Sequence, residues 1–407
     1  MQTRFALQTN SSTARRLVAS LGSLGSLGSL GPLQSAKRRG VFLCALIIVS
    51  MIFATSVFAQ TDIVIGNSSP MGGPIGPSNK EAIAGAQAYF DQVNKRGGVN
   101  GRKISFMVMD DKQDTKISIE NTRQLIEKNN ALALFMYRTS PVLEAVIPVA
   151  MTARVPVLFP QVGPAFAYDE KLKHVFTIRA PYQAEAKIAI EQLTRLGLTR
   201  IAILQADDAY GKDSIKGAEA AMAAAKIVPV AVEKFDNKTS DVAAALEAFV
   251  KAKPQAVLII ASAKGASNLI KGARLKGLAA QFITLSNTSS RAFVEDLGEA
   301  GRGVGIMQIV PNPLRGSALA AEFMKMLEAT PDIKPSHAAL QGFLSAKVLV
   351  EAMQKSGKNL TREKLMSTLE NMNVDYGGFR VSFSPTDHHG SDFIELSVIG
   401  KDGKLLM

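Results

Sequence analysis

Cysteine, tryptophan and histidine are scarce in this chain of 407 residues. It has one cysteine and no tryptophan, so no intramolecular disulfide and no set of cysteine metal ligands can form. The histidines are His174, His337, His388 and His389. None of them has the His-x-x-x-His spacing of a helical metal site. The adjacent pair near the end is interpreted as a solvated loop, because neighbouring side chains of a loop seldom converge on one ion.

Motifs of catalysis are also missing. No Gly-x-Ser-x-Gly elbow is present, and too few histidines lie near a serine-bearing loop to suggest a catalytic triad. The glycine-rich stretch Asn67–Lys80, NSSPMGGPIGPSNK, does not fit a phosphate-binding loop. Lys80 is not followed by Ser or Thr, and Pro74 and Pro77 remove two backbone N–H donors. We therefore expect a protein that is not an enzyme and needs no cofactor or metal.

Acidic residues are absent from residues 1–59, which carry six Lys and Arg residues. This segment contains the basic run Lys37–Arg39, the apolar run Val41–Phe53 and a small-x-Ala pattern ending at Ala59. The order is typical of a signal peptide, which predicts export to the periplasm and cleavage after Ala59. A membrane anchor is the alternative. The basic excess of the remaining chain is small and scattered, so no nucleic-acid partner is expected.

From Asp62 onward, short β-branched runs alternate with amphipathic helical patterns. The predicted strands are Ile63–Gly66, Ile104–Asp110, Ala131–Tyr137, Val155–Phe159, Val175–Arg179, Ile201–Gln205, Val228–Phe235, Ala256–Ala261, Phe282–Leu285 and Val304–Val310, with two late strands at Phe379–Phe383 and Phe393–Ile399. Helices are expected between them, and later at Ala318–Leu327, His337–Ser356 and Arg362–Met372. Such alternation predicts right-handed βαβ units and parallel sheets, hence an α/β fold.

The strand–helix series occurs twice, which predicts two doubly wound, three-layer lobes. We assign residues 60–179 and 311–373 to the first lobe, and residues 180–310 and 374–407 to the second. The late helices and strands imply that the chain recrosses between the lobes. Hinges are therefore expected near Ile178–Tyr182, Ile309–Pro313 and Asn373–Gly378.

Ligands of parallel sheets bind beyond the carboxyl ends of the strands, so the expected site is the cleft between the lobes. Candidate contacts lie in the loops that follow the strands: Ser69, Arg138, Thr139, Gln161, Gly163, Tyr210, Ser262, Ser286 and Asn287. Thr139 at a helix N-terminus and Arg138 suit a carboxylate. Each has a structural alternative: a helix cap for Thr139, Ser286 and Asn287, a surface side chain for Arg138, and packing at the lobe edge for Tyr210.

These residues resemble a known family. Matching stretches are IVIGNSSPMGGPIG, EAIAGAQAYFDQVNKRGGVNGRKI, MVMDDKQD, RIAILQADDAYGKD and GGFRVSFSPTDHHGSD. They are similar to the periplasmic solute-binding proteins of branched-chain amino acid and amide ABC importers. The resemblance covers nearly all of Asp62–Leu406 and implies a type I periplasmic-binding fold with a multi-strand hinge. It also implies a monomer that captures a small polar solute and delivers it to a permease in the inner membrane.

The resemblance also carries site residues. It implies that Thr139 bonds a ligand carboxylate, that backbone groups from Gln161 to Gly163 complete that site, and that Tyr210 closes over the ligand. Where family members often have a threonine, this chain has Gly163. A second-lobe tyrosine of the family is absent near Ser262. The family's acid that pairs with a ligand ammonium is replaced by Ser286.

Because a buried ammonium without a partner is unfavourable, the family's usual amino-acid pose is not expected. The ligand is then an amide, an aromatic or aliphatic carboxylate, or an amino acid held in another way. Two other classes of function stay open. One is a sensor that reports its ligand to a membrane receptor, and the other is an enzyme on a doubly wound fold.

Overall fold

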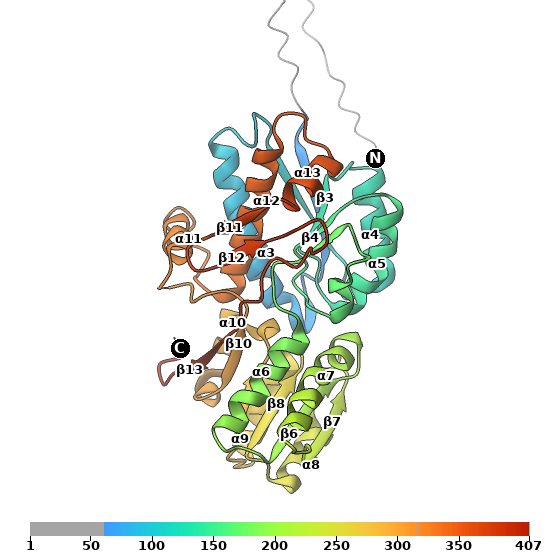
Figure 1. The fold of residues 1–407 in the computed structure, drawn as a ribbon. Helices are drawn as coiled ribbons and strands as arrows, with labels where there is room; N and C mark the ends of the chain where they lie inside the picture. The colour runs from blue at the N-terminus through green and yellow to red at the C-terminus, as the bar shows by residue number, and fades with distance from the viewer. Residues whose placement is uncertain (1–60, 315, 407) are drawn as a thin grey trace, which may run out of the picture. The chain divides into compact units, whose positions relative to one another are not determined.

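The computed structural model describes residues 61–314 and 316–406 (Figure 1). The predicted targeting segment, with its cleavage site after Ala59, lies outside these residues. Residues 61–407 cluster into one compact unit. None of the helices in the described part of the chain is both long enough and apolar enough to cross a membrane.

The first lobe is built on a five-stranded parallel sheet in the order β2-β1-β3-β4-β5. Its strands are β1 Ile63–Ser69, β2 Ile104–Asp110, β3 Ala133–Phe135, β4 Val157–Leu158 and β5 Val175–Phe176, and its helices are α3 Gly76–Lys95, α4 Thr115–Glu127 and α5 Ser140–Thr152. The strand order reverses after β2. Right-handed connections therefore put α3 on one face and α4 and α5 on the other.

The second lobe has a seven-stranded sheet in the order β14-β13-β10-β9-β8-β6-β7. Its strands are β6 Ile201–Ala206, β7 Ala231–Phe235, β8 Ala256–Ile260, β9 Gln281–Thr284, β10 Gly305–Gln308, β13 Glu395–Ile399 and β14 Leu405–Leu406. Its helices are α6 Tyr182–Arg195, α7 Ala209–Ala224, α8 Ala243–Ala252, α9 Ala263–Leu275 and α10 Arg291–Leu297. Strands β6 to β10 are parallel, whereas β13 and β14 are added antiparallel.

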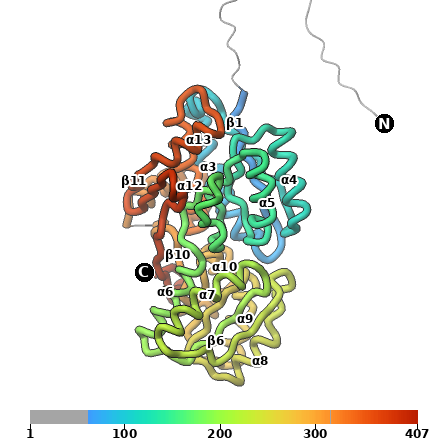
Figure 2. Tube along the Cα trace, turned by 45° about the vertical axis from the view of Figure 1, so that its right-hand side comes forward, coloured from blue at the N-terminus to red at the C-terminus, as the bar shows by residue number. Residues whose placement is uncertain are grey.

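Three further helices and a hairpin return to the first lobe. They are α11 Ala318–Glu328, α12 His337–Ser356, α13 Arg362–Leu369, and the strands β11 Asn373–Asp375 and β12 Arg380–Ser382. Their apolar side chains share one core with α3 and the face of the first sheet that α3 covers. Figure 2 shows these late segments, in orange and red, beside the early blue ones.

The chain crosses between the lobes three times, after β5, after β10 and after β12. The first and third crossings lie side by side, because Thr177 donates to the carbonyl of His388 and accepts from the amide of Gly390. The hairpin β11–β12 contributes Tyr376, Phe379 and Val381 to the core of the first lobe. We therefore propose that the last crossing falls near residue 390, later than the predicted boundary after residue 373.

All ten predicted main strands are present, and the two late ones as well. Strands such as β6 and β8 are buried on both faces, so they appear in the sequence as continuous hydrophobic runs. Local caps also agree with the sequence: the side chains of Asp114 and Asp208 accept backbone N–H bonds at the starts of α4 and α7. Helix α3 begins at Gly76 with Ile75 as its N-cap, so Ser78 lies inside its first turn.

Helices α3 and α12 approach so closely that glycines stand at their contact. A Cβ atom at Gly342 would lie 1.8 Å from the carbonyl oxygen of Ala82. We expect Gly342→Ala to lower the free energy of unfolding by about 1–3 kcal/mol, because two helix backbones must separate. Urea unfolding followed by circular dichroism measures this loss.

The matched control is Gly72→Ala. Its Cβ would meet no atom within 4 Å, and the backbone φ of −133° suits any residue. If both alanine variants unfold at the same urea concentration, the helix contact does not require glycine.

Candidate functional site

A cavity of about 540 Å³ lies between the lobes, at the carboxyl ends of both sheets. Every part of its polar lining follows a strand: Gln113, Asp114, Thr115 and Lys116 after β2; Arg138, Thr139 and Ser140 after β3; Asp207, Asp208 and Tyr210 after β6; Asp236, Asn237 and Lys238 after β7; Ser262 after β8; Asn287 after β9. Ile75, Pro141, Val162 and Tyr182 add apolar surface. The volume suits a small organic molecule.

The structure brings five of the nine predicted site residues to this cavity: Arg138, Thr139, Tyr210, Ser262 and Asn287. The other four, Ser69, Gln161, Gly163 and Ser286, are not part of its lining. They lie behind it, in the hydrogen-bond networks that hold the lining residues. The predicted site residues therefore form two groups: a wall, which lines the cavity, and its support, which holds the wall residues in place.

Arg138 is the buried cation of the cavity wall, with 6% of its surface exposed. Its Nη1 donates to Gln161 Oε1 at 2.7 Å, and its Nη2 donates to Ser78 Oγ and to the carbonyl of Asn287, both at 3.1 Å. Three of the five guanidinium N–H groups are thus used, and two are left. Burial lowers the pKa of Arg138, and the charge of Arg179 lowers it further, although an arginine stays protonated in a protein.

A chain of amides and hydroxyls supports Arg138 from behind. Gln161 Nε2 donates to Asn79 Oδ1 at 3.5 Å, and Asn79 donates to Ser69 Oγ at 2.9 Å. Ser69 in turn donates to Asn67 Oδ1 at 2.6 Å. Ser69 and Gln161 are therefore placed as supports, and the glycine-rich stretch that follows β1 contributes Ser78 to the guanidinium and not a phosphate cradle.

Thr139 and Ser140 stand at the start of α5. Thr139 is the N-cap, with Oγ1 accepting from the amide of Val142 at 3.4 Å, and its φ of 69° is strained for a β-branched residue. Ser140 is fully buried. Its Oγ has no hydrogen-bond partner in the described part of the chain, although Ser140 is one of the residues that line the cavity. The first N–H groups of a helix also lack partners inside the helix.

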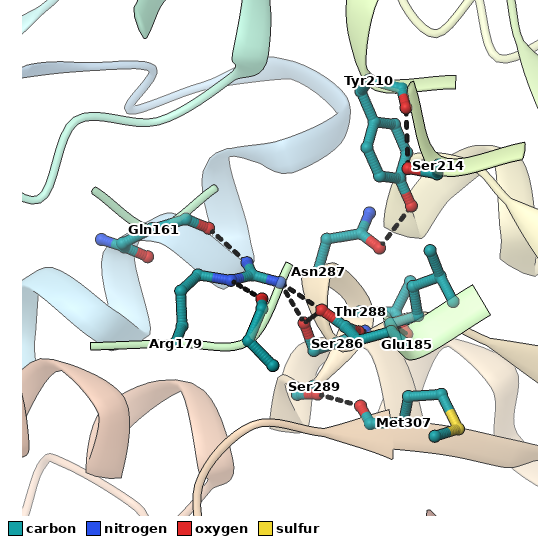
Figure 3. A network of polar contacts seen from close by, with 12 residues as sticks. Gln161, Arg179, Glu185, Tyr210, Ser214, Ser286, Asn287, Thr288, Ser289 and Met307 are labelled. Carbon is teal, nitrogen blue, oxygen red and sulfur yellow. Dashed lines mark hydrogen bonds and ion pairs between the residues drawn. The ribbon is translucent and has the colours of Figure 1, made fainter. Parts of the chain in front are cut away.

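A second arginine, Arg179, lies at the first hinge crossing and escaped the sequence analysis. It forms an ion pair with Glu185, and both side chains are fully buried (Figure 3). The Arg179 guanidinium also donates to the carbonyls of Ala180 and Gln161, each at 3.0 Å. Its Cζ atom lies over the Tyr182 ring, 4.3 Å from the ring centroid. No short motif marks such a pair, because its partners meet only at the start of α6.

Ser286 completes the Arg179–Glu185 pair from the other side of the second lobe. Its amide donates to Glu185 Oε2 at 2.8 Å, and its hydroxyl donates to Oε1 at 3.0 Å. Burial raises the pKa of the Glu185 carboxyl, while the charge of Arg179 and the two bonds from Ser286 oppose that rise. An acid is therefore present beside Ser286, but its oxygens are already occupied.

Close packing explains why position 163 is a glycine, without reference to a ligand-binding hydroxyl. A Cβ atom there would lie 2.8 Å from the carbonyl of Ala180 and 2.9 Å from Arg179 Nε. No side chain fits without moving the hinge. The threonine expected from the resemblance is thus excluded here by the buried guanidinium.

Asn287 links the wall residues of the second lobe. Its Oδ1 accepts from the hydroxyl of Tyr210 at 2.9 Å, and its Nδ2 donates to the carbonyl of Ala261 at 2.7 Å. Tyr210 packs edge-on against Tyr182 with ring centroids 4.6 Å apart. The histidine pair is elsewhere: His388 stacks on Phe176 at the hinge. The described residues include no cluster of three or more potential metal ligands.

Comparisons with known proteins agree with this architecture. Residues 62–404 match a family model described as periplasmic binding protein. Leu/Ile/Val-binding protein homolog 7 of Brucella suis biovar 1 (strain 1330) is 24% identical over 379 residues, which are 88% of this chain and 94% of that protein. A substrate-binding periplasmic protein from Ralstonia solanacearum superposes with a TM-score of 0.80 at 31% identity, covering 85% of this chain and 99% of that one.

A possible leucine/isoleucine/valine-binding protein from Rhodopirellula baltica SH 1 superposes with a TM-score of 0.81 at 24% identity, over 87% and 98% of the two chains. These relatives are binding proteins and not enzymes, which agrees with the expectation from the sequence.

Proposed function

The chain belongs to the periplasmic binding protein family, and on this premise we propose that it is the substrate-binding component of an ABC importer. It captures a small polar solute (an amino acid, an amide or a small carboxylate) between its lobes and delivers it to a permease of the inner membrane. The observation that carries this proposal is the cavity at the carboxyl ends of two parallel sheets. The names of the relatives, which refer to leucine, isoleucine and valine, support the solute class.

Capture requires that the lobes close around the solute, and direct bonds across the cleft support such closure. Arg138 of the first lobe donates to the carbonyl of Asn287 in the second. The Glu81 carboxylate accepts from the amides of Arg291 and Ala292, at 2.9 and 2.8 Å, at the start of α10. A solute that bridges the same gap favours the closed arrangement by its differential affinity.

A solute panel tests the proposal. The purified protein is unfolded and refolded to remove any carried-over solute, then heated with amino acids, their amides and small carboxylic acids. Binding to the native state raises the melting temperature. Cells that lack the gene are expected to lose uptake of the radiolabelled hit. No hit in any class, together with unchanged uptake, would contradict the proposal.

Replacing Glu81 tests closure separately. We expect Glu81→Gln to weaken affinity for the panel hit about fivefold, because about 1 kcal/mol of charge–helix interaction across the cleft is lost. Titration calorimetry measures the affinity. Glu144→Gln, an exposed residue of α5, is the matched control. Equal affinities of both variants would show that Glu81 does not contribute to closure.

We also propose export to the periplasm with removal of residues 1–59, as the signal-peptide pattern indicates. The mass of the protein recovered from the periplasmic fraction is expected to correspond to a chain that begins at Gln60. A monomer is proposed because the lobes must open and close freely.

A further inference from the structure

We infer that the solute is a monocarboxylate with an apolar body and no α-ammonium group, and that Arg138 and Ser140 hold its carboxylate. This inference rests on the proposed function, because it names the class of solute for the same cleft. Its basis is a buried cation of the cavity wall that has no anion beside it among the described residues.

The first observation is that Arg138 is a buried cation without an anion. No carboxylate in residues 61–314 or 316–406 forms an ion pair with it. All three of its hydrogen-bond partners are neutral oxygens. A buried charge is unfavourable unless it is paired, so a missing counter-ion points to the ligand. A planar carboxylate suits the guanidinium fork.

The second observation is independent of the first. Ser140 is among the residues that line the same cavity, and its Oγ is fully buried and has no hydrogen-bond partner among the described residues. It lies at the first residue of α5, where the helix dipole favours a negative group. Arg138 and Ser140 are two residues apart in sequence and line the same cavity. A carboxylate there satisfies both.

The third observation concerns the ammonium group that an amino acid would bring beside its carboxylate. The buried acid of this region, Glu185, is neutralised by Arg179 and bonded twice by Ser286. The acids of the cavity lining are less buried and already bonded. Asp208, for example, accepts from the amide of Gly211 and from Asn237 Nδ2. Next to Arg138, an ammonium would instead meet a buried cation, which repels it.

The apolar body of the solute follows from the rest of the wall. Tyr182 and Tyr210 are both buried and pack edge to face, and Val162, Ile75 and Pro141 extend the apolar surface. Among the described lining residues Arg138 is the one buried cation, so a single negative charge on the ligand is enough to neutralise it. A phosphate monoester or a dicarboxylate would bring a further negative charge with no buried partner.

Matched ligand sets test this inference by titration calorimetry on the refolded protein. One set is 4-methylpentanoate, 4-methylpentanamide and leucine, which share one carbon skeleton. The other is phenylacetate, phenylacetamide and phenylglycine. We expect at least one carboxylate to bind, and its amide and amino-acid counterparts to bind at least 30-fold more weakly.

A leucine that binds as tightly as 4-methylpentanoate would overturn the inference and leave the proposed function intact. The same holds for an amide that binds as tightly as its acid. Acids that fail to bind also overturn it. The proposed function fails only if no amino acid, amide or acid binds, so the two failures are distinguishable.

Ser140→Ala tests the hydroxyl by itself. We expect the affinity for the bound carboxylate to fall about tenfold, while the stability of the ligand-free protein is unchanged or higher, because an unpaired buried hydroxyl is removed. Ser397→Ala is the matched control. Its Oγ is also buried and without a partner in the described chain, but it lies in β13 and does not line the cavity. Equal affinities of both variants would remove Ser140 from the site.

Discussion

Glu185→Gln is expected to lower the free energy of unfolding by about 3–5 kcal/mol, because it leaves the buried guanidinium of Arg179 without its anion. An arginine cannot escape this by losing its proton. The amide also places N–H groups against donors from Ser286, which both point at the carboxylate. Urea unfolding measured by circular dichroism gives the loss.

Glu191→Gln on the same helix is the control for this change. Glu191 Oε1 lies 4.0 Å from Lys187 Nζ, and both side chains are at least partly exposed, so the loss of this pair is expected to change stability by less than about 1 kcal/mol. If the two glutamine variants are equally stable, the buried pair does not hold the hinge together.

Arg179→Met is expected to show a pH dependence that Glu185→Gln lacks. Removing Arg179 takes away an interaction that lowers the pKa of Glu185, so burial raises that pKa further above its unfolded value of about 4.5. Between the unfolded and the folded pKa, the native state binds more protons than the unfolded state. Stability then falls as pH rises. The deficit of Arg179→Met relative to the wild type should therefore be small near pH 4 and grow above it.

Arg138→Met is expected to weaken binding of the carboxylate solute by at least about 30-fold, because truncating one partner of a buried charge pair removes about 2–5 kcal/mol. Stability of the ligand-free protein should change much less, since a buried charge is removed together with three hydrogen bonds. Calorimetry and urea unfolding of the same preparation separate the two effects.

Two variants sharpen the result for Arg138. Arg138→Lys keeps the charge but loses the fork, and we expect it to recover only part of the affinity. Arg123→Met, an exposed arginine of α4, should bind like the wild type. Affinity retained in Arg138→Met would mean that the carboxylate is held elsewhere.

The sequence predicted the cavity wall better than its support. Loops that follow parallel strands converge at one edge, so Arg138, Tyr210 and Asn287 could be selected from the strand pattern alone. The support could not be selected in that way. Ser69 and Gln161 follow strands too, and only the packing of α3 turns them away from the cavity and toward Arg138 through Asn79.

The same limit applies to the buried ion pair. In the predicted elements, Arg179 ends a strand and Glu185 belongs to the helix expected after it. Their shared partner, Ser286, is 101 residues from Glu185 in sequence. The resemblance identified Ser286 as the position of a missing acid, and the structure shows that this serine serves an acid that comes from α6.

The sequence by itself determined the order of strands and helices, the α/β class and the local caps, because hydrophobic periodicity and helix-end hydrogen bonds are set by residues a few positions apart. The tertiary structure alone decided which charges are paired. Arg138 and Arg179 look alike in the sequence, yet folding gives Arg179 an acid and leaves Arg138 only neutral oxygens. The reason is that the surroundings of each arginine depend on segments far apart in the sequence, such as Ser286 for Glu185 and Asn287 for Arg138, which no local pattern can bring together.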